Sequence, residues 1–496
     1  MRLTLKKWLS SLLVVSALTA VSTVAYAAET LRIGQSFMTN GLDPAKGSNG
    51  WALASHGVGE NLYTVNQAGE LVPELADKAE RIDDLNWKIT LKKDRLFSDG
   101  TPVTSKAIAS GFDNTFKLNK AAHATGGLIA FEAPDDLTLM VKTEKPVALI
   151  QALFAEWPLI VYKLNDKGEV IYTGPYAISD FKADTSLDLI ANPHFEGAEK
   201  RSPVHLQKFG DSQSLALAFE SGELDLAFGL PSEIVPRLKN NTDLTLKPFD
   251  VGYQYFAFLN TGRPALQDVQ VRRAIDLALD RTQLIQSINA GNIATGAYAA
   301  YFPFAMKEPR LTDLAEAEKI LDSASWVKTA SGVREKDGKP LLLLVATYSQ
   351  RADFVTMLPV MKSALMAMGA QVETKIVENG NEYGAEGDFD VFLWAQHTAP
   401  TGDPAFFLNS MLRSGASLNF SRYASAEFDS IIDGFANETD MAKRVDIARL
   451  AQEKLFEDVP ASFLVSPVWT VGLSKRLENY QPWGSDYHVL RADMGE

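Results

Sequence analysis

The sequence predicts an α/β protein with open sheets, divided into two or three lobes. Short segments with strand-like alternation recur along the chain, and segments with helical spacing lie between them. Strands and helices mixed in this order are typical of the α/β class. The chain has 496 residues, more than one hydrophobic core usually supports, so several lobes are expected at about 150 residues per domain.

Alternation of apolar and polar side chains predicts the strands. Residues 31–34 form the first one, and residues 87–91 and 137–141 alternate like half-buried strands. Helical spacing is clearest in residues 105–118, where Ile108 and Phe112 recur on one face. Further helices are predicted at 269–279, 315–321, 354–368 and 442–455.

The first 27 residues have the pattern of a cleaved signal peptide. Three basic residues lie within positions 1–7, an apolar run follows at 8–24, and residues 25–27 offer the small-x-small pattern of a cleavage site. The apolar run is short and contains several Ser and Thr residues, which argues against an uncleaved anchor. Because the chain has no cysteine to carry a lipid, we expect an unanchored periplasmic protein.

Composition excludes several classes of function. The absence of cysteine excludes disulfides, thiol catalysis and cysteine metal clusters. The formal net charge is -14, and it becomes more negative without the leader, so nucleic acid and anionic membranes are poor partners. We find no Gly-x-Ser-x-Gly elbow, no phosphate-binding glycine loop and no histidine pair at metal-ligand spacing. No catalytic residue, metal ligand or cofactor is therefore predicted.

Short motifs follow one another through the first half of the chain. They are Gly-Leu-Asp-Pro at 41–44, Glu-Asn-Leu-Tyr at 60–63, Leu-Val-Pro-Glu-Leu-Ala at 71–76, and Trp-Lys-Ile-Thr-Leu at 87–91 before Phe-Ser-Asp-Gly-Thr-Pro at 97–102. In the last of them, Asp-Gly supplies a turn and the proline fixes the chain that follows. Turn and core chemistry of this kind identifies a fold and does not contact a ligand.

The second half continues the series. It contains Thr-Gly-Pro-Tyr at 173–176, Ala-Phe-Glu-Ser-Gly-Glu-Leu-Asp at 218–225, Phe-Leu-Asn-Thr at 258–261 before Val-Arg-Arg-Ala-Ile at 271–275, Phe-Asp at 428–429 and Asp-Val-Pro at 458–460. In this order the motifs resemble the bacterial extracellular solute-binding proteins of family 5. That family comprises the peptide- and nickel-binding receptors of ABC importers.

The resemblance implies a fold and a mode of action. The fold is a two-lobed periplasmic-binding-protein type II clamp of the large class, with an extra subdomain in lobe one. Carried onto this chain, lobe one combines residues 28–48, 170–257 and 470–496, the inserted subdomain covers 49–169, and lobe two covers 258–469. The implied protein is a monomeric receptor without enzymatic activity that closes on a small ligand and delivers it to an inner-membrane ABC permease.

The segment 394–404 is similar to the loop that faces the cleft in this family, but it matches neither known ligand pattern. Peptide-binding members carry an aspartate three residues before the Asp/Glu-Pro pair, where this chain has Pro400. Nickel-binding members carry Tyr-Asp-Pro-His and a later histidine, whereas Ala405 follows Asp403-Pro404 here. We expect a short peptide or peptide-like solute, with a nickel or other metal chelate as the alternative. A periplasmic chaperone or sensor on the same fold is a third alternative.

Seven residues are candidates for ligand contact. His397 could bind a metal chelate or a carboxylate, although a lone loop histidine is more commonly solvated or bonded internally. Asp403 could hold an amine, although an aspartate before proline usually caps a turn or helix. Aromatic side chains could pave an apolar floor, although large rings are core residues by default. The set comprises Trp51, Tyr253, Tyr255, Trp394, His397, Thr401 and Asp403.

Overall fold

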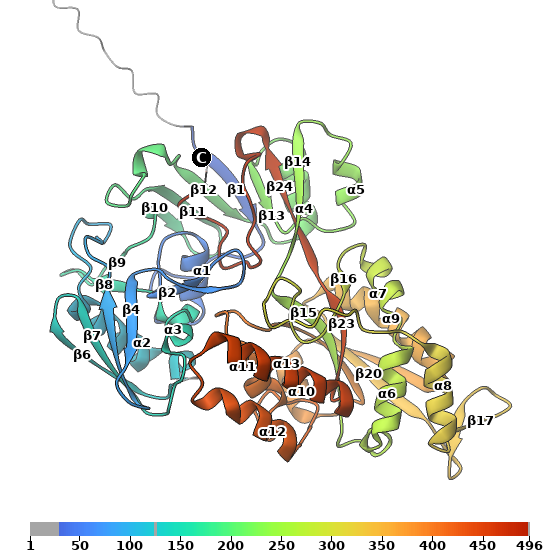
Figure 1. The fold of residues 1–496 in the computed structure, drawn as a ribbon. Helices are drawn as coiled ribbons and strands as arrows, with labels where there is room; N and C mark the ends of the chain where they lie inside the picture. The colour runs from blue at the N-terminus through green and yellow to red at the C-terminus, as the bar shows by residue number, and fades with distance from the viewer. Residues whose placement is uncertain (1–28, 124–125, 495–496) are drawn as a thin grey trace, which may run out of the picture.

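Two large β-sheets, each with its own hydrophobic core, organise the chain in the computed structural model (Figure 1). The structure describes residues 29–123 and 126–494, so the predicted signal peptide lies outside the described residues. Helices and strands are mixed throughout the chain, which confirms the predicted α/β class. The first predicted strand is β1 (Leu31–Gln35).

The sheet of lobe one has seven strands. Its order is β10 (Tyr176–Lys182), β11 (Ser186–Ala191), β12 (Val204–Lys208), β1, β13 (Leu226–Phe228), β24 (Val468–Ser474) and β14 (Leu244–Asp250). β1 is parallel to both of its neighbours, β12 and β13, so these three strands end at the same edge. Helices α4 (Ser212–Glu220) and α5 (Val235–Leu238) pack against this sheet.

The sheet of lobe two has six strands. Its order is β16 (Asn292–Ile293), β23 (Ala461–Ser466), β15 (Tyr253–Leu259), β22 (Val391–His397), β20 (Leu342–Tyr348) and β21 (Gln371–Val377). β20 is parallel to β21 and β22. A small three-stranded sheet, β17 (Val327–Lys328), β18 (Arg334–Lys336) and β19 (Lys339–Pro340), extends from the same lobe.

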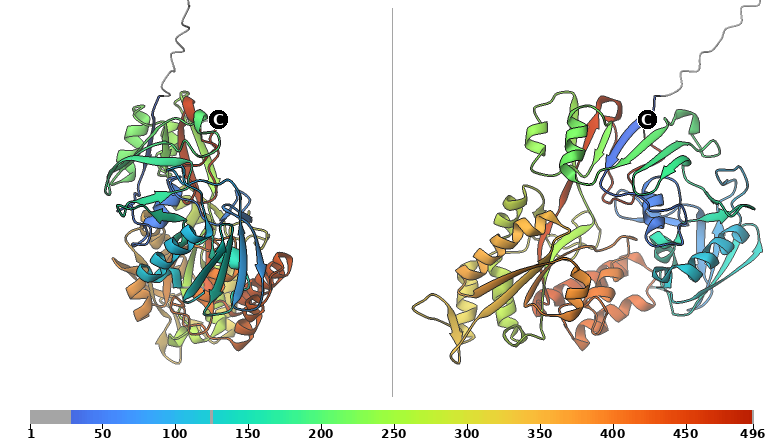
Figure 2. Two further views of the ribbon diagram at one scale, coloured as in Figure 1. Left: turned by 90° about the vertical axis from the view of Figure 1, so that its left-hand side faces the viewer. Right: turned by 180° about the vertical axis from the view of Figure 1, so that it is seen from behind.

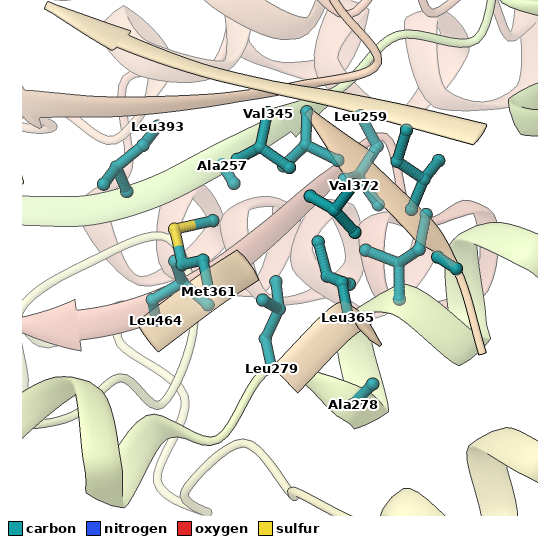
Figure 3. Close-up of a cluster of buried hydrophobic side chains, with 14 of the residues drawn as sticks. Ala257, Leu259, Ala278, Leu279, Val345, Met361, Leu365, Val372, Leu393 and Leu464 are labelled. Atoms are coloured by element: carbon teal, nitrogen blue, oxygen red, sulfur yellow. The ribbon is translucent and has the colours of Figure 1, made fainter. Parts of the chain in front are cut away.

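Strand alternation places a different core on each face of the second sheet. In β22, Leu393 belongs to the cluster shown in Figure 3, whereas Phe392 and Trp394 belong to an aromatic cluster on the opposite face. The first face is covered by α6 (Val269–Ala278), α7 (Arg281–Ile288), α8 (Leu314–Ser323) and α9 (Ala352–Ala367). The second is covered by α10 (Gly380–Glu386), α11 (Ala405–Phe407), α12 (Ala426–Asp433) and α13 (Met441–Asp458).

The inserted subdomain has its own sheet and core. Strands β4 (Ala76–Arg81), β5 (Asn86–Leu91), β7 (Thr138–Thr143) and β6 (Ile129–Asp135) form the sheet, in that order, against α2 (Ser105–Leu118). Two hairpins, β2–β3 (Tyr63–Val65, Leu71–Pro73) and β8–β9 (Tyr162–Leu164, Val170–Tyr172), and the short helices α1 (Asn49–Ser55) and α3 (Ile150–Leu153) complete this part of the chain. Seen from behind, the subdomain lies beside the orange-red helices of lobe two (Figure 2).

The elements predicted from periodicity are confirmed. The strands expected at 87–91 and 137–141 are β5 and β7, and the helix expected at 105–118 is α2. The four helices expected in the second half of the chain correspond to α6, α8, α9 and α13. Side-chain caps fix several of these starts, because Thr104 and Asp313 accept hydrogen bonds from backbone N–H groups in the first turns of α2 and α8.

The chain passes between the two large sheets at Gly252 and at Pro467. β14 of the first sheet ends at Asp250, and β15 of the second begins at Tyr253. β23 returns to the first sheet as β24 after a single residue, Pro467. The lobe borders expected at 257/258 and 469/470 fall inside β15 and β24, a few residues beyond these crossings. Tyr253 and Tyr255 accordingly belong to the sheet of lobe two.

A buried charge network ties the helices of lobe two to its sheet. The Asp276 carboxylate accepts hydrogen bonds from Arg281, Arg310 and Ser462, and the side chain of Arg281 is fully buried. Arg281 also donates to the backbone oxygen of Phe463 on β23 at 2.9 Å. Removing one partner of such a network leaves the other charge buried and uncompensated.

We therefore predict that Asp276→Ala lowers the free energy of unfolding by about 3–5 kcal/mol, because Arg281 loses its buried counterion. Urea unfolding followed by circular dichroism measures the change. The matched control is Asp243→Ala, which removes an exposed carboxylate from a surface pair with Lys475 and is expected to have a much smaller effect. Equal losses in the two variants would contradict a structural role for the network.

Candidate functional site

The cleft between the lobes is lined by residues at the carboxyl ends of parallel strands. Phe37 follows β1 and Phe228 ends β13 in lobe one, while Arg351 follows β20 and His397 ends β22 in lobe two. In open α/β sheets, ligands bind outside the carboxyl ends of the strands. The two sheets therefore present their binding edges to the same space.

Seven aromatic side chains in this space form a closed circuit of ring contacts, and we call them the cleft aromatics. They are Phe37, Trp51, Tyr487, His397, Tyr253, Trp469 and Phe228, in the order of their contacts. Successive ring centroids are 4.7 to 6.5 Å apart. Tyr253 and His397 come from lobe two, Trp469 lies on β24, and the others come from lobe one with its subdomain and C-terminal segment. Both lobes thus contribute to one aromatic cluster at their boundary.

Three of the predicted contact residues belong to the cleft aromatics. Trp51 lies on α1 and stacks on Phe37 at 4.7 Å between ring centroids. Tyr253 lies 5.3 Å from His397, and the buried His397 reaches Tyr487 at 5.9 Å. Trp51 Nε1 and His397 Nδ1 are buried and have no hydrogen-bond partner among the described residues. Both nitrogens are therefore available to a polar group that enters the cleft.

Tyr255, the fourth candidate, lies at the edge of this site. Its ring is buried in the core of lobe two, but its hydroxyl accepts a hydrogen bond from Arg351 Nη1 at 3.1 Å. The same hydroxyl donates to Asp353 Oδ2 at 2.7 Å. Tyr255 therefore orients the Arg351 guanidinium and leaves its own ring in the core.

The structure places Trp394, Thr401 and Asp403 outside the cleft aromatics. Trp394 points to the opposite face of β22 from His397 and packs in the aromatic core of lobe two. Both Asp403 oxygens accept hydrogen bonds from Arg444 Nη2, at 2.6 and 2.7 Å, and Oδ1 also accepts one from the Ala405 N–H. This carboxylate fixes the turn that leads into α11 and pairs with Arg444 of α13, which is a structural role common for an aspartate before proline.

A second hollow lies between the inserted subdomain and lobe two, and Thr401 and Asp403 line it. It has a volume of about 430 Å³. Its apolar wall comes from residues 146–153 of the subdomain, and its polar wall includes Asn409, Arg413 and Arg444 of lobe two. Two smaller cavities of about 20 and 50 Å³ lie where Pro400 meets lobe one, and His488 lines both of them. The loop after β22 thus runs along the seam between the lobes.

Two charged residues of the cleft were not predicted. Arg351 lies 5.5 Å from the Tyr253 ring centroid, measured from its guanidinium carbon. Asp486, in the C-terminal segment of lobe one, is buried, and burial raises the pKa of its carboxyl group to about 6. Arg351 follows a strand end, which is a signal that sequence analysis could have used. Asp486 carries no comparable signal, because residues 478–494 form no helix or strand.

A family model for the bacterial extracellular solute-binding proteins, family 5 Middle, matches residues 70–419. The chain belongs to this family. It is 22% identical to the nickel-binding protein NikA of Staphylococcus aureus over 435 residues, which cover 86% of each chain. It is 26% identical to the periplasmic oligopeptide-binding protein OppA of Escherichia coli over 460 residues, which cover 82% of each chain.

The crystal structure of a nickel ABC transporter protein from Bacillus halodurans superposes on the chain with a TM-score of 0.84 at 25% identity. The superposition covers 94% of this chain and 99% of the other. These comparisons confirm the predicted family and the two-lobed fold. Family 5 proteins are transport receptors for small ligands, and their named relatives include both peptide-binding and nickel-binding proteins.

The described part of this family 5 protein was searched for metal-ligand groups and for membrane-spanning helices. Within residues 29–123 and 126–494, no group of three or more histidine, cysteine or carboxylate side chains is placed to hold a metal ion. None of the helices in the described part of the chain has the length and apolar character needed to cross a bilayer.

Three histidines in the lining of the cleft have strongly lowered pKa values. Burial lowers the pKa of His56, His397 and His488 to about 3, and a smaller contribution comes from His488 acting on His397. The three imidazoles are therefore neutral at pH 7. Asp486 has a shift of opposite sign, because its raised pKa favours the protonated carboxyl below pH 6.

A hairpin of lobe one contacts lobe two beside this lining. The β2–β3 turn ends at Gly69, whose φ is 78°, and a Cβ built there would lie 2.7 Å from the Phe302 ring. The β8–β9 turn has the same pattern at Gly168, with a φ of 77° and nothing within 4 Å of the same Cβ position. In both turns, an asparagine side chain three residues earlier accepts backbone N–H bonds. The two turns therefore differ mainly in the interlobe contact.

We predict that Gly69→Ala separates the lobes, because the added methyl group overlaps the Phe302 ring. Small-angle scattering is expected to show a larger radius of gyration than for the wild type. Gly168→Ala is the matched control, since it imposes the same left-handed strain of about 1 kcal/mol without the contact. Indistinguishable scattering profiles for the two variants would show that the hairpin does not hold the lobes together.

A second prediction concerns pH. Because the folded pKa of His397 is about 3 and an unfolded histidine titrates near 6.5, the unfolded state binds more protons between these values. Stability is therefore lost as the pH falls below about 6.5, by about 2 kcal/mol at pH 5 for one such histidine. His397→Gln should reduce the decline in melting temperature between pH 7 and 5. Replacement of the exposed His194 by Gln provides the control, and parallel curves for His397→Gln and the wild type would contradict the assignment.

Proposed function

We propose that this chain is the periplasmic substrate-binding subunit of an ABC importer and that it binds a short peptide or peptide-like solute in the cleft. The observation that carries the proposal is the circuit of cleft aromatics, because both lobes contribute rings to it. Apolar rings with a few polar groups placed among them are typical of small-molecule sites. The same rings contribute large contact area at a low entropic cost.

The position of the cleft aromatics supports a receptor that signals by closing. A ligand held by Tyr253 of lobe two and Trp51 of the lobe one subdomain contacts both halves of the clamp only when the lobes are together. Such a ligand binds the closed form better than the open one and shifts the population toward it. We propose that the closed form delivers the solute to the inner-membrane permease.

A metal chelate is the second candidate, and the specific observation in its favour is a histidine from each lobe. His397 of lobe two and His488 of the C-terminal segment line one cavity, and His397 has a free ring nitrogen. Neutral imidazoles are common metal ligands. The described residues offer no third ligand of the usual kinds, so a chelator would have to supply the others. We place this candidate second because it depends on metal ligands that the described residues do not supply.

The remaining parts of the proposal follow from the sequence. We propose that residues 1–27 direct export and are removed, that the mature chain has no lipid anchor, and that it acts as a monomer. We further propose that it performs no chemistry on its ligand, consistent with the absence of any nucleophile or metal-ligand motif from the sequence.

The test is a thermal-shift screen of the purified mature protein at pH 7.5. The probes are L-amino acids, di- and tripeptides, nickel alone, and nickel with L-histidine. A true ligand at a hundred times its Kd stabilises the native state by about 2.7 kcal/mol and raises the melting temperature. We expect peptide-like probes to do so. A shift only with nickel and L-histidine would reverse the order of the two candidates, and flat curves with every probe would refute a receptor for these solutes.

A further inference from the structure

A hollow of about 440 Å³ lies on lobe two, outside the circuit of cleft aromatics, and we call it the accessory hollow. Segment 295–307, which connects β16 to α8, forms most of its wall, and Arg449 of α13 completes it. All seven cleft aromatics are described residues, and none of them lines it. Its volume lies within the range of small-molecule sites, which is about 300 to 1,000 Å³.

Hydrogen bonds from α13 hold the wall of the accessory hollow in place. Arg449 Nη2 donates to the Pro303 backbone oxygen at 2.8 Å. The fully buried Gln452 donates to the Phe304 oxygen at 2.9 Å, and its own side-chain oxygen accepts the Ala297 N–H at 3.1 Å. The segment is therefore fixed to the helix at three points, so the hollow is a built feature of lobe two.

The charged side chains in the lining are both cationic. Lys307 and Arg449 line the accessory hollow, and no aspartate or glutamate of the described residues does so. Neither cation forms an ion pair within 4.0 Å in the described part of the chain. The chain as a whole has a net charge of -14, so its overall charge does not account for two unneutralised cations in one hollow. The lining therefore favours an anionic ligand.

A hydroxyl group and an apolar surface complete the lining. Thr295 Oγ1 is buried and has no hydrogen-bond partner among the described residues. Buried hydroxyls normally have a partner, so this one marks a position where a polar group of a ligand would be satisfied. Phe302 and Met306 supply apolar surface. The lining as a whole suits a small molecule with an anionic group beside an apolar body.

Two rings separate the accessory hollow from the boundary with lobe one. Tyr301 and Phe302 line the hollow, and they also line the cavity of about 20 Å³ at the lobe boundary. Their ring centroids are 4.3 Å apart. Toward lobe one, the Tyr301 hydroxyl donates to the Gly484 backbone oxygen at 3.3 Å, and the Phe302 ring meets the turn at Gly69. A ligand in the hollow therefore contacts side chains that also touch lobe one.

We propose that the accessory hollow binds a small organic anion and that its occupancy favours the closed arrangement of the lobes. The two cations and the Thr295 hydroxyl bind the anionic group, and Met306 and Phe302 contact the apolar part. An anion that holds Tyr301 and Phe302 where they touch lobe one stabilises the closed form over the open form. The coupling is reciprocal, so closure also raises the affinity for the anion. This site is separate from the cleft and does not depend on the solute that the cleft binds.

The first experiment tests the charge of the ligand. Isothermal titration calorimetry of the mature protein at pH 7.5 compares benzoate and phenyl phosphate with neutral benzamide and cationic benzylamine. We expect both anions to bind, benzamide to bind about 10- to 100-fold more weakly, and benzylamine not to bind, because charged hydrogen bonds have this size. The relative affinities of the two anions distinguish a carboxylate from a phosphate ligand. Equal binding of benzoate and benzamide, or no binding of either anion, would overturn the inference.

The second experiment places the anion in the accessory hollow. Lys307→Gln and Thr295→Val should each weaken benzoate binding about 10-fold or more. Lys307 is exposed and the Thr295 hydroxyl has no partner, so neither unliganded variant should melt below the wild type. The controls, Lys319→Gln and Lys443→Gln, remove exposed cations of lobe two outside the hollow and should bind benzoate like the wild type. Wild-type affinity in Lys307→Gln and Thr295→Val would locate the anion elsewhere and refute the proposed site.

The third experiment tests the link to closure. In Gly69→Ala the added methyl group overlaps Phe302 from the side of lobe one, so benzoate should bind about 5-fold more weakly or worse, the lower end of typical coupling between sites. Gly168→Ala lacks this contact and should bind benzoate like the wild type. By reciprocity, saturating benzoate should reduce the radius of gyration of Gly69→Ala. Equal affinities in the two variants, or a radius that benzoate leaves unchanged, would contradict the link between the hollow and closure.

Discussion

The short connections at Gly252 and Pro467 are the constraint on which the cleft depends. Two strands of one sheet continue into two strands of the other after only one or two residues, so the lobes are joined where both sheets begin or end. Tyr253 and Trp469 come immediately after these connections, and their rings are 5.4 Å apart. The backbone that joins the lobes therefore also carries two of the cleft aromatics. A rotation at this hinge changes the cluster of cleft aromatics directly, without an intervening element.

Gly252 shows why the connection tolerates so little change. A Cβ at this position would lie 2.3 Å from His397 Cε1 and 2.8 Å from the Tyr301 hydroxyl. The Gly252 N–H donates to the Gly484 backbone oxygen at 2.7 Å, and the Gly252 oxygen accepts from the Thr398 N–H at 3.0 Å. The lobe connection, the end of β22 and the C-terminal segment thus meet at one residue without a side chain. This close approach of three backbones brings His397 and Tyr487 into the same circuit.

Local patterns predicted the elements but only part of the site. Periodicity located β5 and α2 because each element buries one face, and that pattern is visible within the element's own residues. Asp403 could not be assigned, since an aspartate before proline has the same local pattern whether it faces a ligand or Arg444, which lies 41 residues further on. The position of Asp486 depends on still more distant contacts. Its segment has no regular secondary structure and is held by packing in the core of lobe one. Local spacing therefore could not show the roles of Asp403 and Asp486, whose partners are distant in the sequence.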